Sequence, residues 1–238
     1  MSTFGYLLYL VPKNLLSFLV GKLVNMPLPE PLAKFSVKWF MQRYQIQIRE
    51  AEFPLDAYKT IGQLFTRRLK PGLRPIGEGV VHPSDSQVTR AGQILNNQLV
   101  QAKGKTYSLA GLIGDKELAA AFIDGYYLTY YLCPTDYHRV HSPVSGEITS
   151  CVHIPGRLWP VNPWSVEHIS QLFSVNERVS VQIRTGRGLL LVVMVGATNV
   201  GKITLNFDSD IVTNQSHWRA QKVKTYALAI PVQKGQDL

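Results

Sequence analysis

The sequence predicts an α+β protein in which N-terminal helices precede a β-rich domain. Up to residue 76, apolar residues recur at helical spacing between proline-marked breaks. From residue 79, short apolar runs alternate with turn signals, as in strands. The 238 residues are 45% hydrophobic and 17% charged, which is typical of a globular protein with a sizeable core. We therefore expect two regions, residues 1–76 and residues 77–238.

Residues 4–26 are strongly apolar, but the apolar run is interrupted. A helix that spans a bilayer needs about 20 consecutive apolar residues, and Pro12-Lys13-Asn14 and Lys22 break this run. The segment also has no basic start and no small-residue cleavage site, which argues against a signal peptide. The pattern favours a pair of short helices in a membrane interface, with a pair of core-packing helices as the alternative.

Two further helices are expected at residues 33–49 and 58–70. The second carries a basic cluster near its end and is stopped by Pro71-Gly72. That cluster suits the carbonyl end of a helix dipole, and it also suits attraction to phospholipid head groups. The first helix carries apolar residues along one face, namely Val37, Phe40, Met41, Tyr44 and Ile48.

The net charge of +9 is unevenly distributed. Residues 1–76 hold 11 Lys+Arg against 4 Asp+Glu, whereas the remainder holds 14 against 12. The basic residues are interleaved with aliphatic runs and accompany no nucleic-acid motif, so an anionic membrane surface is the favoured partner. Cys133 and Cys151 fall in expected strands and are predicted to be buried small residues rather than a disulfide or a metal pair.

The β-rich region contains seven expected strands and an interrupting helix. Leu189 to Val195 is continuously apolar, which indicates a strand buried on both faces. The helix is expected around residues 108–113 and 117–122. The expected strands are residues 94–101, 126–133, 144–152, 178–184, 188–196, 199–207 and 222–230.

The most informative stretch follows the strand at 126–133. Pro134 ends that strand, and Asp136-Tyr-His-Arg-Val-His-Ser-Pro143 comes directly after it. Titratable side chains often have functional roles in short loops that a rigid sheet positions. Residue types alone leave three interpretations open: a polar turn with hydrogen-bonded histidines, a metal site with His138, His141 and Asp136, and acid–base catalysis.

This stretch resembles the Asp-Tyr-His-Arg-x-His-x-Pro motif of phosphatidylserine decarboxylases. The resemblance runs along nearly the whole chain and favours acid–base catalysis. Further matching segments follow in order, namely Phe65–Ile76, His82–Asp85, Gln101–Leu109, Ile154–Gly156, Leu172–Val179, Val195–Gly201 and Lys234–Asp237.

The resemblance implies roles for Asp85, His141 and His138. In the family, the matching Asp and His form a triad with a serine that attacks the preceding carbonyl, and the chain cleaves itself. Asp85 would orient His141, whose imidazole would take the serine proton. Ser86 stands where the family often has Gly, which leaves the geometry of this turn open. His138 is expected to return a proton after CO₂ is lost, or to bind the carboxylate or phosphate beside it.

The resemblance also implies a pyruvoyl cofactor. Formed from the cleavage-site serine, this group makes a Schiff base with phosphatidylserine and acts as an electron sink during decarboxylation to phosphatidylethanolamine. The 238 residues contain no Gly-Ser pair of the kind at which the family cleaves. We therefore expect this chain to be the β-chain portion of the proenzyme, with the pyruvoyl group on an α chain.

The expected partners are that α chain, phosphatidylserine and an anionic membrane surface, with a homodimer as a further option. The resemblance implies a peripheral protein on the cytoplasmic side of a bacterial inner membrane. No metal and no nucleic acid are expected. Two alternatives stay open at this point: a catalytically inactive lipid-binding homologue, and a metal hydrolase built on His and Asp.

Overall fold

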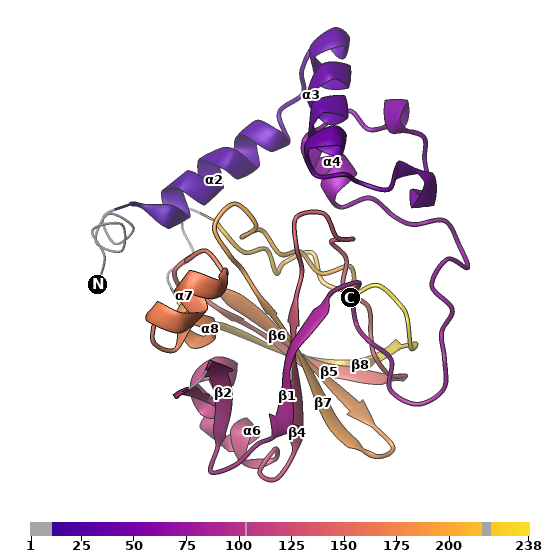
Figure 1. Ribbon diagram of the computed structural model, residues 1–238. Coiled ribbons are helices and arrows are strands. Elements are labelled where there is room, and N and C mark those ends of the chain that lie inside the picture. The colour runs from indigo at the N-terminus through magenta and orange to yellow at the C-terminus, as the bar shows by residue number, and fades with distance from the viewer. Residues whose placement is uncertain (1–10, 103, 216–219) are drawn as a thin grey trace.

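The protein has a mixed α and β fold, which confirms the coarse fold class expected from the sequence. The computed structural model describes residues 11–102, 104–215 and 220–238. The helices α2 (Lys13–Val24), α3 (Glu30–Arg43) and α4 (Ile61–Phe65) precede the first strand and lie at one end of the molecule (Figure 1). Two 3₁₀ turns, η1 (Ile48–Glu50) and η2 (Leu55–Ala57), connect α3 to α4. Residues 4–10 of the expected helix pair lie outside the described residues.

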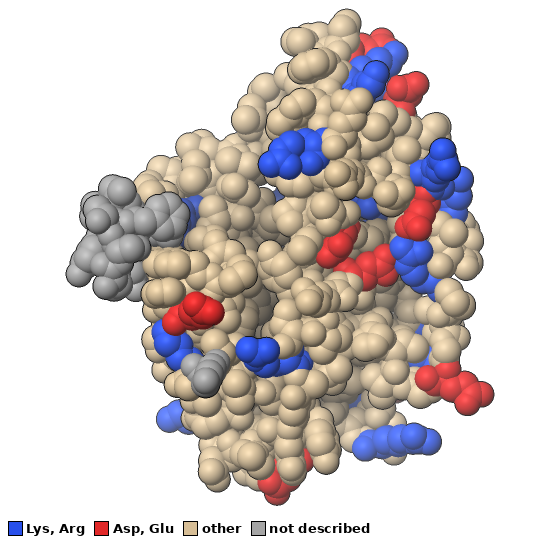
Figure 2. Space-filling model, viewed as in Figure 1, with Lys and Arg blue, Asp and Glu red and all other residues tan. Residues whose placement is uncertain are grey.

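Helix α2 is attached to the β-rich part at its first turn. The side chain of Asn14 donates to the Gly156 carbonyl at 2.8 Å and accepts from the Leu158 amide at 3.1 Å. The outer side of α2 exposes leucines, and few charged side chains lie over it in Figure 2. Within the described ranges, no helix combines the length and the apolarity that crossing a bilayer requires.

Helices α3 and α4 share a small core of their own. Val37 and Leu64 are 1% and 0% exposed, and Ile46, Ala51 and Tyr58 complete the buried cluster. The other members of the predicted apolar face pack against it, namely Phe40, Met41, Tyr44 and Ile48. The helical periodicity of residues 33–49 therefore identified the buried face correctly, although α3 ends at Arg43.

The expectation of a helix over residues 58–70 is wrong beyond Phe65. Helix α4 begins after the N-cap Thr60, whose side chain accepts from the Gln63 amide at 3.1 Å, and it has only five residues. The chain after it is extended and pairs with the segment around η1. The Glu52 amide donates to the Arg68 carbonyl and the Lys70 amide to the Glu50 carbonyl, both at 2.8 Å. This non-local pairing overrides the local helical pattern.

The main sheet has four antiparallel strands in the order β7-β6-β5-β8. Their bounds are β5 (Gly146–Ile154), β6 (Arg178–Thr185), β7 (Gly188–Val195) and β8 (Lys222–Val232). Two smaller antiparallel pairs flank it: β1 (Gln87–Gln93) with β4 (Tyr126–Tyr131), and β2 (Gln98–Ala102) with β3 (Lys105–Ser108). The remaining helices are short, namely α5 (Leu109–Ile113), α6 (Lys116–Ala120), α7 (Pro163–His168) and α8 (Leu172–Val175).

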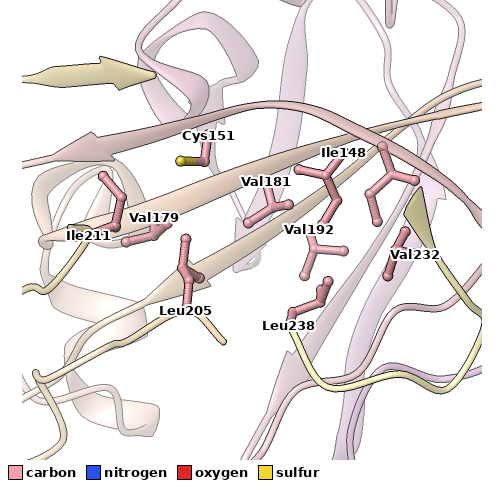
Figure 3. Close-up of a cluster of buried hydrophobic side chains, with 10 residues drawn as sticks. Ile148, Cys151, Val179, Val181, Val192, Leu205, Ile211, Val232 and Leu238 are labelled. Carbon is pink, nitrogen blue, oxygen red and sulfur yellow. The ribbon is translucent and has the colours of Figure 1, made fainter. Parts of the chain in front are cut away.

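Strand β7 packs against apolar clusters on both faces, as its continuous apolar run predicted, and Val192 is its buried residue. Val192 belongs to the cluster drawn in Figure 3, which also contains Ile148, Cys151 and Leu238, and Leu190 and Met194 pack against this cluster. Leu191 and Val193 point the other way and pack against a second cluster that includes Leu112 and Ile113. Cys151 is fully buried, and both Cys151 and Cys133 are free thiols.

The expected strands were mostly correct in type and shifted in their bounds. The strand expected at 199–207 is wrong, because this segment forms only isolated bridges such as Thr204 with Val212. It is held by loop contacts instead, including the Asn206 amide bonded to the Leu238 carbonyl. The sequence reading missed β1, whose residues Gln87–Gln93 are almost all exposed and therefore give no apolar signal.

Candidate active site

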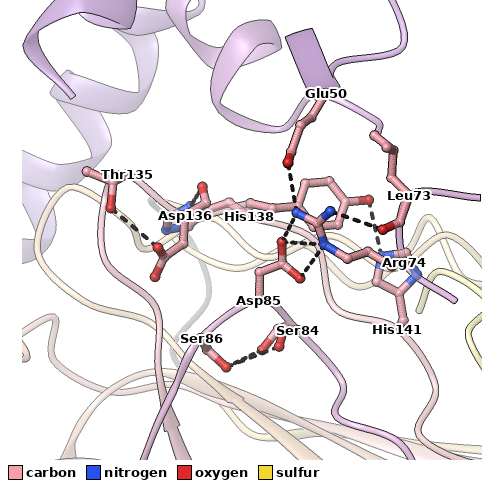
Figure 4. Close-up of polar contacts among 11 residues, drawn as sticks. Glu50, Leu73, Arg74, Ser84, Asp85, Ser86, Thr135, Asp136, His138 and His141 are labelled. Atoms are coloured by element: carbon pink, nitrogen blue, oxygen red, sulfur yellow. Dashed lines mark hydrogen bonds and ion pairs between the residues drawn. The ribbon is translucent and has the colours of Figure 1, made fainter. Parts of the chain in front are cut away.

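The Asp136–Pro143 segment lies between β4 and β5, and a tight turn built by Asp136 begins it. The Asp136 carboxylate accepts from the Cys133 amide at 2.7 Å, and the Asp136 amide donates to the Cys133 carbonyl at 2.9 Å. This is a β-turn from Cys133 to Asp136, and the Asp136 side chain braces it from its last position. Asp136 therefore shapes the loop that presents His138 and His141 (Figure 4).

His141 has a hydrogen-bonding partner on each ring nitrogen. Its Nδ1 lies 2.9 Å from the Gly235 carbonyl and 3.4 Å from Oδ1 of Asp237. A carbonyl can only accept, so Nδ1 carries the proton, and Nε2 presents its lone pair to the Tyr137 hydroxyl 3.1 Å away. In this tautomer, Nε2 is the basic nitrogen of the site.

The Tyr137 hydroxyl remains a proton donor at neutral pH. Tyr137 is 7% exposed, and its burial, together with the charge of Asp237, raises its pKa to about 12. The hydroxyl thus stays protonated and donates to His141. It occupies the position from which another hydroxyl could donate to Nε2.

The last residues of the chain form one wall of the site. The Ser142 amide donates to the Gln236 carbonyl at 2.7 Å, and the Gly235 amide donates to the Ser142 carbonyl at 2.8 Å. Gly235 has a φ of +83°, and a Cβ there would approach Ile76 to 2.6 Å, so glycine is required. This turn brings the carboxylate of Asp237 against the histidine segment.

Asp237 forms an ion pair inside this wall. Nη1 of Arg139 donates to its Oδ2 at 2.9 Å, and both side chains are about one-fifth exposed. The same Asp237 carboxylate faces Nδ1 of His141. Asp237 is therefore the carboxylate closest to the His141 imidazole in the described structure, a position that the sequence reading did not predict.

Asp85 lies on the loop before β1 and is bound by Arg74. Nε and Nη2 of Arg74 donate to its carboxylate at 2.7 to 3.1 Å, and Nη2 also donates to Glu50 at 2.8 Å. Among the described residues, no hydrogen bond joins Asp85 to His141. The two loops do meet, because the His141 amide donates to the Pro83 carbonyl at 2.7 Å. The proposed pairing of Asp85 with His141 stays a prediction.

His138 lies on the opposite side of the segment from His141, against the end of α4. Its ring stacks on Phe65 with 3.8 Å between centroids, and its Nδ1 donates to the Asp136 carbonyl at 3.0 Å. Burial lowers the pKa of His138, and the nearby charge of Arg67 lowers it further. His138 is therefore neutral at neutral pH, with Nε2 as its free lone pair. Its role in proton return is not tested by this geometry.

Both histidines of the segment are hydrogen-bonded, and acid–base catalysis by them stays a prediction. Where the chain is described, no three His, Cys, Asp or Glu side chains lie close enough together to hold a metal ion. The loop presents the imidazole of His141, whose basic Nε2 is oriented by hydrogen bonds, and a second, neutral imidazole, that of His138. Sequence reasoning missed Arg67, Arg74, Tyr137 and Asp237 as parts of this site, although all four fall inside motifs that carry the family resemblance.

Comparison with known proteins gives a consistent result. The family model for phosphatidylserine decarboxylase matches residues 61–238. A phosphatidylserine decarboxylase proenzyme from Anaeromyxobacter sp. (strain K) is 44% identical over 97% of this chain and 83% of its own length. One from Myxococcus xanthus (strain DK1622) is 41% identical over 100% of this chain and 85% of its own length. A third, from Shewanella woodyi (strain ATCC 51908 / MS32), is 42% identical over 82% of this chain and 69% of its own length.

The family match includes every residue that builds the site except Glu50, and the first two proenzymes align with almost all of the chain. A match of this extent, together with a histidine segment assembled as described, identifies the chain as a member of the phosphatidylserine decarboxylase family.

Proposed function

We propose that this chain is the β-chain portion of a proenzyme that decarboxylates phosphatidylserine to phosphatidylethanolamine. The observation that carries this proposal is the 41–44% identity, over 97–100% of the chain, to proteins named phosphatidylserine decarboxylase proenzyme. The orientation of His141 supports it, because self-cleavage requires a base, and Nε2 of His141 carries no proton in this tautomer. The inactive lipid-binding alternative has no comparable support.

His141 acts as the base in self-cleavage. With its proton held on Nδ1 by the Gly235 carbonyl, the imidazole offers Nε2 to an incoming serine hydroxyl. The serine would take the place of the Tyr137 hydroxyl, which is 3.1 Å from Nε2. Asp85 can stabilise the resulting imidazolium once its carboxylate turns from Arg74, and Asp237 already faces Nδ1.

The site fits a pyruvoyl group on a separate α chain. The fit rests on His141, whose orientation is what serine activation needs, and on His138, a second imidazole in the same loop. When present, the pyruvoyl carbonyl withdraws electrons from the substrate and makes loss of CO₂ possible. His138 holds its Nδ1 proton on the Asp136 carbonyl and keeps Nε2 available to bind or relay a proton.

The test of the proposed function uses the complete natural reading frame. The protein is expressed, its chains are weighed by mass spectrometry, and release of labelled CO₂ is measured from phosphatidylserine carrying the label in its carboxyl group. We expect two processed chains and CO₂ release. Intact protein that releases no CO₂ would instead favour the inactive lipid-binding alternative.

We further propose that the protein is peripheral on the cytoplasmic side of a bacterial inner membrane and binds through α2 and α3. Large apolar side chains are exposed on both helices, including Leu19 at 54%, Leu23 at 63% and Phe35 at 70%. Lys22 and Lys38 lie on the same two helices and suit anionic head groups, whereas Lys34 pairs with Glu30 at 2.7 Å.

Vesicle sedimentation tests this membrane contact. We expect the protein to bind vesicles rich in anionic lipid more strongly than phosphatidylcholine vesicles. Phe35→Glu should weaken that binding, whereas Ile123→Glu, at an isoleucine 61% exposed after α6, should not. Equal loss in both variants would argue that the contact is not localised to the helices.

A homodimer is also proposed, with β8 as its contact. This strand lies at an edge of the main sheet, and Leu228 and Val223 on it are 88% and 60% exposed. An open edge strand with apolar side chains is suited to pairing with another chain. Light scattering after size-exclusion chromatography would measure the mass, and Leu228→Lys should shift it toward a monomer.

A further inference from the structure

Arg67 is a buried cation that has almost no hydrogen-bonding partner. Its side chain belongs to a residue only 5% exposed, in the extended segment after α4. Within the described part of the chain, its one hydrogen bond is a long one, from Nη1 to the Leu64 carbonyl at 3.4 Å. Its Nε is fully buried and has no partner among the described residues. A guanidinium has five donors and keeps its charge in proteins, so most of its capacity is unused.

The carboxylates near Arg67 are already engaged by another arginine. Glu50 and Asp85 are the acidic groups whose charges act on Arg67. Both accept hydrogen bonds from Arg74, at 2.8 Å for Glu50 and 2.7 Å for the shortest bond to Asp85. The hydroxyl of Tyr58, another electrostatic neighbour of Arg67, is also buried without a partner. The two nearby carboxylates are therefore hydrogen-bonded to Arg74, and among the described residues neither accepts a hydrogen bond from Arg67.

Arg178 shows how this fold satisfies a buried arginine that has a structural role. Arg178 is 3% exposed and donates to the carbonyl oxygens of four residues at 2.6 to 2.8 Å, namely Gly111, Leu112, Ser174 and Asn176. Arg67 is buried to a similar extent but lacks such acceptors. A buried charge without a counter-charge is destabilising, so the fold carries Arg67 at a cost. Such a cost is common where a group serves binding instead of stability.

The free guanidinium lies beside the catalytic histidine segment. Phe65, two residues before Arg67, stacks on His138 at 3.8 Å. Between them, the Thr66 carbonyl accepts from Nε of Arg139 at 2.9 Å, which fixes the extended segment against the loop. The charge of Arg67 acts directly on His138 and on Tyr137. An anion bound by Arg67 would therefore lie next to His138.

We propose that Arg67 binds an oxyanion of the substrate head group, either its phosphodiester or its carboxylate, at the His138 side of the site. Both groups are planar or tetrahedral oxyanions that accept the paired donors of a guanidinium. The proposal rests on the proposed function for the identity of the substrate. Two observations carry the proposal. Among the described residues, Nε of Arg67 has no hydrogen-bonding partner, and the two nearby carboxylates already bind Arg74.

The binding test follows the Nε–H resonance of Arg67 by nitrogen-15 NMR in the 238-residue chain, and it needs no catalytic activity. The resonance is assigned by its disappearance in Arg67→Lys. The probes are glycerophosphoserine, glycerophosphoethanolamine and inorganic phosphate. We expect glycerophosphoserine to shift the resonance. A matching shift with glycerophosphoethanolamine or phosphate identifies the phosphodiester as the bound group, whereas a shift with glycerophosphoserine alone identifies the carboxylate. No shift with any of the three overturns the proposal.

Two buried-arginine variants separate binding from folding. Arg67→Met should keep or raise the melting temperature, because it removes an uncompensated charge, and should weaken glycerophosphoserine binding by about tenfold to a hundredfold. Arg178→Met should lower the melting temperature, since it leaves four carbonyl oxygens without a donor. Arg90→Met, at an exposed arginine on β1, should change neither property. A melting temperature of Arg67→Met as low as that of Arg178→Met, with unchanged affinity in the folded fraction, would assign Arg67 a structural role.

Decarboxylation in the complete proenzyme distinguishes failure of this inference from failure of the proposed function. If CO₂ is released by the wild type and equally by Arg67→Met, the function stands and the inference fails. If the wild type binds glycerophosphoserine through Arg67 but releases no CO₂, the inference stands and the proposed function fails.

Discussion

Arg74 binds the carboxylate of Asp85 through three hydrogen bonds of 2.7 to 3.1 Å, and the same guanidinium binds Glu50 at 2.8 Å. Arg74 thus ties the helical region to the loop that precedes β1. The side chains of Arg74 and Asp85 are 43% and 34% exposed, so solvent screens the pair and its net contribution is about 1 kcal/mol or less. Asp85 can therefore exchange Arg74 for another partner at small cost.

Asp85→Asn should slow self-cleavage of the complete proenzyme. An amide cannot stabilise the His141 imidazolium, and the corresponding change in a serine-protease triad costs about 10⁴-fold in rate. The rate of cleavage is measured by denaturing gel electrophoresis of pulse-labelled protein. Glu50→Gln is the matched control, because Glu50 is the other carboxylate bound by Arg74 and should leave the rate unchanged. Equal rates for wild type and Asp85→Asn would remove Asp85 from the mechanism.

His141→Ala should block self-cleavage without unfolding the protein. The substitution removes Nε2, the free basic nitrogen of the site, while the backbone bonds of residue 141 to Pro83 are retained. Mass spectrometry of the purified protein would then find only the uncleaved proenzyme. His168→Ala removes an exposed histidine that stacks on Trp164 outside the loop and should cleave normally. Normal processing of His141→Ala would show that another group is the base.

His138→Ala should give cleaved protein that decarboxylates slowly. A positioned acid or base contributes about 10² to 10⁴ in rate, and cleavage itself depends on His141. Labelled CO₂ release from the purified, fully cleaved variant measures the loss. A wild-type turnover rate would exclude His138 from proton transfer and leave it as a packing partner of Phe65.

The lowered pKa of His138 also predicts how stability depends on pH. The folded state favours neutral His138, whereas the unfolded chain protonates it with a pKa near 6.5. The stabilisation is therefore fully present above about pH 6.5 and is lost as the pH falls through the lower pKa of the folded state. Urea unfolding at pH 7.5, 6.5 and 5.5 should give a smaller acid-induced loss for His138→Gln than for wild type. His168→Gln should follow the wild-type curve, and parallel curves for all three proteins would contradict the assignment.

Asp237→Asn should destabilise the folded protein. It weakens the charge-assisted bond from Arg139 at 2.9 Å, in a pair that is about one-fifth exposed, so we expect a loss of about 1–3 kcal/mol in the free energy of unfolding. Glu147→Gln is the control, because its bond to Arg184 joins side chains 51% and 59% exposed. That variant should lose less than about 1 kcal/mol in urea unfolding. Equal losses would mean that partial burial gives the Asp237 pair no additional strength.

The sequence predicted the helices and strands in which buried residues recur at a regular spacing along the chain. The period of 3.6 residues identified Val37 and Tyr44 on the buried face of α3. The continuous apolar run identified β7 as a strand covered on both faces. These predictions succeeded because burial of one face or two faces leaves a pattern in neighbouring residues. The strand β1 leaves no such pattern, since its side chains are mostly exposed, and it was missed.

The sequence by itself also determined the family and the chemical types at the site, because the motif from Asp136 to Pro143 is long and specific. Only the tertiary structure decided which groups meet. Residues 66–70 are extended because they pair with Glu50 and Glu52, and this pairing buries Nε of Arg67 without a hydrogen-bonding partner among the described residues. Arg74 reaches Asp85, and Asp237 reaches His141, across 11 and 96 positions of sequence. Such contacts depend on backbone pairing between distant segments, which local spacing does not encode.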